Sequence, residues 1–222
     1  MSDLDASLPN RVPFSEATPS KAGPPAAKTV AAIDVGSNAL RMAIAEVSPD
    51  GHIEVLERLQ RAVRLGQDTF RRGRLGGETL RAAMAVLRDF KQLLDLYKVE
   101  RVRAVATSAI REASNADTFL DRAFMATGLN FEVIDTSEES RLTVSAVHQA
   151  IAGAMGVDHE GALIVDVGGG STLLTLLEDG EIVTAQSLRL GSIRMLEMLT
   201  NSEDPPERTA ELLRHHIGNV IH

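Results

Sequence analysis

Apolar and polar residues alternate in two similar stretches of this chain, and each stretch predicts three short strands. Near the N-terminus, apolar runs bounded by turn residues predict strands over 29–34, 39–47 and 52–64. The same succession returns further on and predicts strands over 161–166, 172–178 and 181–189. An Asp-Gly pair separates the second strand from the third in each set, at Asp50-Gly51 and Asp179-Gly180. The pattern therefore predicts two β-meanders.

The segments between and after the meanders change to helical spacing. Apolar residues at Leu80, Met84, Leu87 and Leu94 predict a helix over 77–96. A short buried strand is expected over 102–106, followed by a helix over about 115–127 and a strand over 131–134. A helix to about 154 then begins near Ser137, its expected N-cap. Two more helical patterns cover 192–199 and 206–221.

Four landmarks recur in the same order in both stretches: an Asp-x-Gly turn, an apolar run, an Asp-Gly pair and an Arg-Leu-Gly triplet. The first copy contains Asp34-Val-Gly36-Ser37-Asn38 and Val63-Arg-Leu-Gly66, and the second contains Asp166-Val-Gly168-Gly169-Gly170-Ser171-Thr172 and Leu188-Arg-Leu-Gly191. Recurrence at nearly constant spacing indicates a duplicated unit. Its two Asp-x-Gly turns are expected to face each other across a cleft suited to phosphate.

The expected organisation is a disordered tail over 1–28, a first unit over 29–156 and a second unit over 157–222. The tail is rich in Pro, Ser and Ala and lacks periodicity. After its long helix the first unit continues into strand, helix, strand and helix, for which the second unit has no room. We therefore expect an incomplete second unit in a fragment of a longer protein, because three meander strands alone leave a sheet edge open.

Composition excludes several classes of site. The 222 residues include no Trp, one Tyr and no Cys, which argues against an aromatic platform for nucleic acid, disulfides and thiolate metal sites. No apolar run approaches a membrane span and no signal peptide is visible, so we expect a cytoplasmic protein without membrane or nucleic-acid partners. The net charge is −8, yet residues 55–111 carry 13 basic and 6 acidic side chains. That block suits a polyanion, although solvated helix faces explain it equally well.

Both turns offer groups that bind phosphate. Glycine lets the backbone approach closely, and Ser37, Asn38, Ser171 and Thr172 add polar donors. Asp34 and Asp166 are expected at the ends of buried strands, where they could orient water or hold Mg²⁺. The alternative is that Gly and Asp act here only as turn formers, which two matched copies make less attractive.

Two further segments carry candidate chemistry. Thr107-Ser-Ala-Ile-Arg111 follows a strand directly, so Arg111 could grip phosphate, or the segment could be an ordinary N-cap with a surface Arg. Glu138 and Glu139 begin a helix, where a carboxylate could serve as a general base. Acidic residues also suit the first turn of any helix, and the residues alone do not choose between the two.

Motifs in this order resemble those of the exopolyphosphatase / guanosine pentaphosphate phosphatase family. They are Asp34-Val-Gly-Ser-Asn-Ala-Leu-Arg41, Ala106-Thr-Ser-Ala-Ile-Arg111-Glu-Ala-Ser-Asn115, Ser137-Glu-Glu-Ser-Arg-Leu142 and Asp166-Val-Gly-Gly-Gly-Ser-Thr172, with Leu65-Gly66 and Gly73-Arg-Leu75 between them. The resemblance implies an α/β, actin-like (ribonuclease H-like) duplicated fold. It also implies Mg²⁺-dependent hydrolysis of terminal phosphoanhydrides in polyphosphate or guanosine pentaphosphate, and leaves a homodimer open.

The resemblance also assigns roles to individual residues. Glu139 matches the catalytic base and Asp166 the Asp of the second phosphate turn, while Arg111 matches a phosphate-binding Arg. The remaining phosphate-binding positions are Asp34, Gly36, Ser37 and Asn38 in the first turn, and Gly168, Gly169, Gly170, Ser171 and Thr172 in the second. Asp34 and Asp166 are the candidate metal ligands.

One position departs from the family pattern. Leu173 stands where the second turn usually continues with Glu. That Glu is thought to position metal or water, so its absence motivates an alternative function: a weak or inactive protein that binds polyphosphate or alarmone nucleotides. A third reading, an actin-like sugar or acetate kinase, is disfavoured by the Glu138-Glu139-Ser-Arg141-Leu142 motif.

Overall fold

The computed structural model describes residues 26–151, 161–199 and 205–221. Its strands are β1 (Lys28–Val35), β2 (Ala39–Val47), β3 (Ile53–Ala62), β4 (Arg101–Ala106), β5 (Glu132–Val133), β6 (Ala162–Val167), β7 (Thr172–Glu178) and β8 (Glu181–Leu188). Its helices are α1 (Leu65–Arg72), α2 (Gly77–Leu96), α3 (Ser108–Arg111), α4 (Ala116–Thr127), α5 (Thr136–Ile151), α6 (Ser192–Leu199) and α7 (Pro206–Ile221). Residues 1–25 of the expected tail, and 152–154 of the helix expected to end there, lie outside the described residues.

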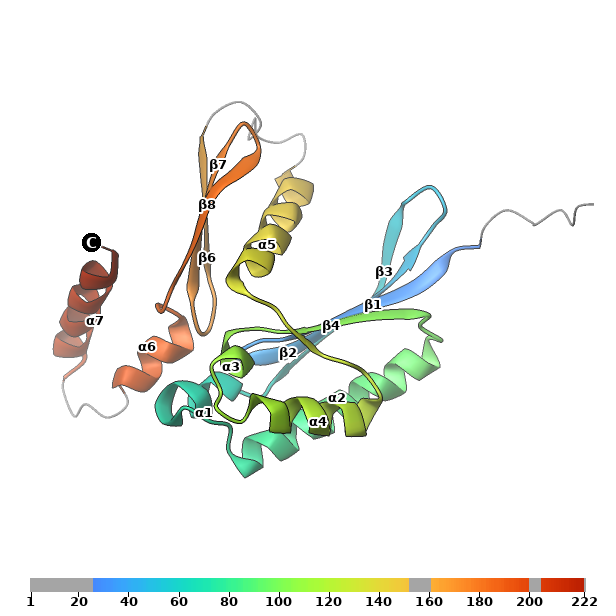
Figure 1. The fold of residues 1–222 in the computed structure, drawn as a ribbon, viewed down its shortest axis with the longest axis horizontal. Coiled ribbons are helices and arrows are strands. Elements are labelled where there is room, and N and C mark those ends of the chain that lie inside the picture. The colour runs from blue at the N-terminus through green and yellow to red at the C-terminus, as the bar shows by residue number, and fades with distance from the viewer. Residues whose placement is uncertain (1–25, 152–160, 200–204, 222) are drawn as a thin grey trace, which may run out of the picture.

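The described strands form two sheets (Figure 1). The first has the order β3-β2-β1-β4-β5, with an antiparallel meander on one side of β1 and parallel pairs on the other. The second is the antiparallel meander β6-β7-β8. Both predicted meanders are therefore present.

The main core lies between the first sheet and the helices α2 and α4, which run side by side beneath it (Figure 1). The helical spacing of α2 buries the four apolar residues that predicted it, together with Phe90. Phe119 of α4 is fully buried and meets Phe131 edge to face, with 6.4 Å between the ring centroids. Packing on one face of the sheet leaves its strand ends free for α1, α3 and the second unit.

The internal repeat is visible in the backbone. The Gly36 amide donates to the Ala39 carbonyl at 3.2 Å, and the Gly168 amide donates to the Ser171 carbonyl at 2.9 Å. Each meander also has a register irregularity at the corresponding place of its second strand, after Ile44 in β2 and after Leu176 in β7. The two turns are thus alike in hydrogen bonding as well as in sequence.

Three local expectations were wrong. The helix α1 was missed, because only Leu65, Gly66 and Thr69 face inward and eight residues are too few to show a period. It begins after Arg64, which has a left-handed φ of 57°, and Gly73 closes it with a φ of 69°. Asp135 rather than Ser137 caps α5, since its carboxylate accepts the Glu138 amide at 2.9 Å.

The third error concerns β6, which was expected to be buried. Leu163, Val165 and Val167 are 53–64% exposed. Among the described residues β6 pairs only with β7, whereas β1 has a strand on each side. The strands on both sides of β1 cover it. The apolar composition of β6 does not reveal that a second neighbouring strand is missing from the described residues beside it.

Candidate functional site

The two Asp-x-Gly turns meet each other directly. The Ser37 hydroxyl lies 2.9 Å from the Ser108 hydroxyl at the start of α3, and both are buried. Gly170 packs against this pair: a Cβ there would lie 2.3 Å from Ser108 Oγ and 2.9 Å from Ser37 Oγ. Only glycine fits at such a distance, so the Gly-rich second turn is explained by its close approach to the first.

A helix start supports each turn. The Gly66 amide at the start of α1 donates to the Ser37 carbonyl at 2.8 Å. The Ser192 and Ile193 amides of α6 donate to the Gly168 and Gly169 carbonyls at 3.0 and 2.9 Å. Amides in the first turn of a helix have no partner within the helix, and here they hold the turns. This explains why an Arg-Leu-Gly triplet follows each meander.

The structure places Glu138 and Glu139 in different environments. Glu138 bonds to Arg141 and Arg103, both at 2.7 Å, and these partners lower its pKa to about 2. The Glu139 side chain is 20% exposed, and its burial raises its pKa. The charge and hydrogen bond of Arg111 oppose this shift, while the charges of Asp34 and Asp166 add to it. A base that works near neutral pH needs such a raised pKa, so the geometry favours Glu139 over Glu138.

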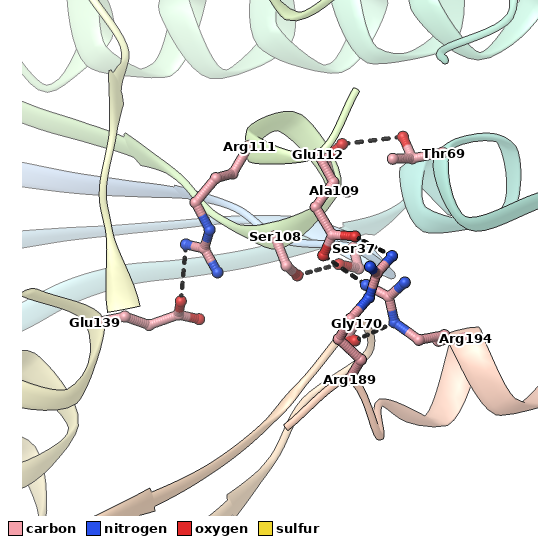
Figure 2. A network of polar contacts seen from close by, with 10 residues as sticks. All are labelled: Ser37, Thr69, Ser108, Ala109, Arg111, Glu112, Glu139, Gly170, Arg189 and Arg194. Carbon is pink, nitrogen blue, oxygen red and sulfur yellow. Dashed lines mark hydrogen bonds and ion pairs between the residues drawn. The ribbon is translucent and has the colours of Figure 1, made fainter. Parts of the chain in front are cut away.

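Arg111 joins the candidate base to the end of the first sheet (Figure 2). Its Nη1 donates to Glu139 Oε2 at 3.1 Å and to the Ile134 carbonyl at 2.7 Å. Both contacts use the same nitrogen, and a guanidinium has five N–H donors. Arg111 can therefore hold Glu139 and still present its planar fork to an oxyanion.

The two aspartates of the repeat differ in their cross-strand partners. Asp34 lies opposite Arg41, whose Nη1 is 3.1 Å from its carboxylate, while burial raises the pKa of Asp34. Asp166 is exposed and lies opposite Leu173, which is 3% exposed. The departure at Leu173 thus leaves Asp166 without the charged cross-strand partner that Asp34 has.

The other predicted residues lie in or beside the turns. Asn38 has an exposed side chain, and its carbonyl accepts the Val63 and Arg64 amides at 3.2 and 2.9 Å. The Thr172 hydroxyl donates to the Leu190 carbonyl at 2.7 Å and so braces the turn itself. Ser171 is buried. The structure therefore brings the predicted residues of both units to one place.

The described residues offer limited support for a metal. Within them, no three His, Cys, Asp or Glu side chains lie close enough to form a metal-binding cluster. Mg²⁺ is nevertheless often held by one or two carboxylates together with substrate phosphates. Asp166 fits that mode, whereas Asp34 already pairs with Arg41.

Sequence reasoning missed the contacts of four residues that link the units. Glu112 of the first unit bonds to Arg194 and Arg189 of the second (Figure 2). Phe70 of α1 also contacts Arg194. In a single sequence, an arginine on a short helix, such as Arg194 on α6, looks the same as one that is exposed to solvent. Its position three residues after Gly191 is the only available signal.

Known proteins resemble this chain in sequence. Exopolyphosphatase 2 of Mycobacterium tuberculosis is 36% identical over 185 residues, which cover 80% of this chain and 56% of that protein. A guanosine-5'-triphosphate,3'-diphosphate pyrophosphatase of Aliivibrio fischeri is 34% identical over 167 residues, 75% of this chain and 32% of that protein. The chain therefore spans about half or less of the length of these curated relatives.

Solved structures show the same fold. A Ppx/GppA family member from Aquifex aeolicus has a TM-score of 0.66 at 33% identity, and covers 84% of this chain and 59% of its own. An exopolyphosphatase from Cytophaga hutchinsonii has a TM-score of 0.79 at 27% identity, with 87% and 61% covered.

The fold defines an actin-like α/β protein, as the resemblance implied, and its two Asp-x-Gly turns lie in contact. Residues 43–222 match the profile of the Ppx/GppA phosphatase family. The chain belongs to this family.

Proposed function

We propose that this chain carries the catalytic site of a hydrolase that releases terminal phosphate from inorganic polyphosphate or guanosine pentaphosphate. The position of Glu139 carries the proposal: a largely buried carboxylate with a raised pKa, paired with Arg111 beside the two turns. Two relatives, an exopolyphosphatase and a guanosine-5'-triphosphate,3'-diphosphate pyrophosphatase, support both substrate classes.

In the proposed reaction Glu139 removes a proton from a water molecule while the oxygen of that water attacks the terminal phosphorus. The bond from that phosphorus to the bridging oxygen breaks, and the shortened chain leaves with the electron pair. Backbone amides of the Gly168–Thr172 turn and the Arg111 fork stabilise the charge on the transferred phosphoryl group. Mg²⁺, when bound by Asp166 and phosphate oxygens, would supply further neutralisation of that charge.

A groove beside Asp34 offers a path for the rest of a polyanion. It has a volume of about 460 Å³ and is lined in part by Arg41, Arg58 and Arg103, with Leu142 of α5 at its wall. Arg41 is already paired with Asp34 and Arg103 with Glu138, so Arg58 is the cation of this groove best placed to attract phosphate. The basic block noted in the sequence thus contributes to this groove.

Phosphate release from long-chain polyphosphate and from guanosine pentaphosphate tests the proposal, with the two neighbouring glutamates as a matched pair. Glu139→Gln is expected to lower kcat by about 10²–10⁴-fold, the usual contribution of a general base. Glu138→Gln removes an equal charge one residue away, in an exposed ion pair, and is expected to retain activity.

Equal rates for the two variants would exclude Glu139 as the base. Tight binding of polyphosphate without release by the unaltered chain would contradict the enzymatic proposal and leave the binding protein that Leu173 suggested. The preferred substrate decides whether the role lies in polyphosphate turnover or in the stringent response.

We further propose that the protein works in the cytoplasm, consistent with its lack of cysteine. No helix in the described part of the chain is long and apolar enough to cross a membrane.

A further inference from the structure

Arg194 lies at the point where the two units meet, and it contacts three separate segments. Its Nε donates to the Gly170 carbonyl at 2.7 Å and its Nη2 donates to Glu112 Oε1 at 2.5 Å. Its guanidinium carbon lies 4.0 Å above the centroid of the Phe70 ring. The residue is only 7% exposed, which is unusual for an arginine. We call these four residues the Arg194 bridge.

The contacts of Arg194 divide between the units. Gly170 belongs to the second turn, whereas Glu112 ends α3 and Phe70 belongs to α1, both in the first unit. A single planar side chain thus joins the second turn to two helices of the first unit. Figure 2 shows its bonds to Gly170 and Glu112. An arginine suits this place because its fork donates in two directions while its face stacks on an aromatic ring.

Close packing makes the position of the second turn sensitive to this bridge. Gly170 already lies against Ser37, Ser108 and Phe70, with no room for a Cβ. The groups of the first turn and of the second must both reach one phosphoryl group. A shift of the Gly170 carbonyl would therefore change the distance between the groups of the first turn and those of the second.

Glu112 also connects the bridge to the candidate base. It follows Arg111 directly, and Arg111 bonds to Glu139 on the opposite side of α3 (Figure 2). Burial lowers the pKa of Arg194, and the charge of Glu112 offsets this effect. Removal of Glu112 would leave a buried cation without its partner, which is costly.

We propose that Arg194 is a positioning residue, held by Glu112 and Phe70, that fixes the second phosphate turn against the first. This inference rests on the proposed function for its kinetic consequence, but its structural part can be measured without activity.

The structural test uses distances between the units. The chain contains no cysteine, so spin labels can be placed at Asp121→Cys on α4 and Glu181→Cys on β8, both exposed. Arg194→Met retains an unbranched apolar side chain over Phe70 and removes both hydrogen bonds. We expect it to broaden or shift the label-to-label distance distribution. Circular dichroism verifies that the variant is folded.

Arg189→Gln is the matched control. Arg189 binds the other oxygen of Glu112 at 2.9 Å, but its side chain is 76% exposed. Its loss removes a cation from the same carboxylate and is expected to leave the distance distribution unchanged, because exposed ion pairs contribute little. An Arg194→Met distribution that matches that of Arg189→Gln would overturn the positioning role.

Kinetics provide a second readout. Arg194→Met is expected to lower kcat/KM for phosphate release by about 10²-fold, the cost of a misplacement near 1 Å. Part of the loss should appear as a raised KM, since a displaced turn binds phosphate less well. A smaller folded fraction would lower kcat at constant KM, and that result would contradict the inference.

The partnership with Glu112 can be tested with a double-mutant cycle. Glu112→Gln alone should reproduce the direction of both effects, and combining it with Arg194→Met should add little. Strict additivity of the two changes would show that the residues do not act together. If the unaltered chain releases no phosphate, the proposed function fails, while the distance measurements still decide the positioning role.

Discussion

Gly191 lies where a single added methyl group should disturb the second Asp-x-Gly turn, which the proposed function assigns to phosphate. A Cβ at this position would be 2.3 Å from both the Gly169 carbonyl oxygen and the Gly170 carbonyl carbon. Ordinary contact begins near 3.4 Å, so Gly191→Ala requires a separation greater by about 1 Å. The obstructing atoms belong to the backbone, so no side-chain rotation relieves the clash.

Two consequences follow from that displacement. Overpacking of this kind costs about 1–3 kcal/mol of the free energy of unfolding, which lowers Tm by roughly 2–4 °C for each kcal/mol in a chain of this size. Movement of the turn by about 1 Å is also expected to reduce phosphate release by about 10²-fold. Thermal unfolding by circular dichroism and a phosphate-release assay measure the two effects.

Gly218→Ala is the control for Gly191→Ala. Gly218 lies within α7, and a Cβ there would have no heavy atom within 4 Å. Alanine in a helix interior is expected to add up to about 1 kcal/mol of stability. If Gly191→Ala behaves like Gly218→Ala in both assays, the close contact between α6 and the second turn is not present in the protein.

Four further predictions address the base, the metal and the core. Burial raises the pKa of Glu139, and a base acts only when it is deprotonated. As the pH is lowered, the rate of phosphate release should therefore begin to fall at a pH above the ordinary pKa of a glutamate. A rate that falls only at the ordinary glutamate pKa would contradict this. Because the pKa of Glu139 is higher in the folded state than in the unfolded state, its ionisation destabilises the fold at a pH above the folded-state pKa. Glu139→Gln should therefore raise Tm at neutral pH, and this gain should disappear below the unfolded-state pKa. Leu173→Glu places a second carboxylate opposite Asp166 and should tighten Mg²⁺ binding, which calorimetry measures. The loss of a buried leucine should also lower Tm. An unchanged Mg²⁺ affinity would argue against a metal at Asp166. Phe119→Ala should cost about 3–5 kcal/mol in urea unfolding, since its ring is fully buried, and a cost below 1 kcal/mol would contradict the described core.

Local patterns predicted most of the elements because each carried its own signal. The α2 helix shows its 3.6-residue period over 20 residues, and the paired Asp-Gly turns separate the strands of each meander. The short α1 helix carried no such period, because its inner face has three buried residues of which one is glycine. Exposure of β6 was also unpredictable, since burial of a strand depends on its neighbours rather than on its own residues.

The candidate site divides in the same way. Asp34, Arg111, Asp166 and the glycines of the second turn were recognisable from motif and repeat, and their roles remain predictions. The residues alone left Glu138 and Glu139 open, and the family resemblance assigned the base to Glu139. The structure adds a physical difference between them, because both occupy the first turn of α5 and only their surroundings differ.

By itself, the sequence determined that the chain has two copies of one strand-and-turn unit, since spacing and periodicity are local properties. Tertiary structure alone decided that the two turns touch, that Glu139 faces inward, and that Arg194 joins the units through Glu112. These features arise between segments about 30 to more than 130 residues apart. Their distances, burial and pKa values depend on how the folded chain brings those segments together.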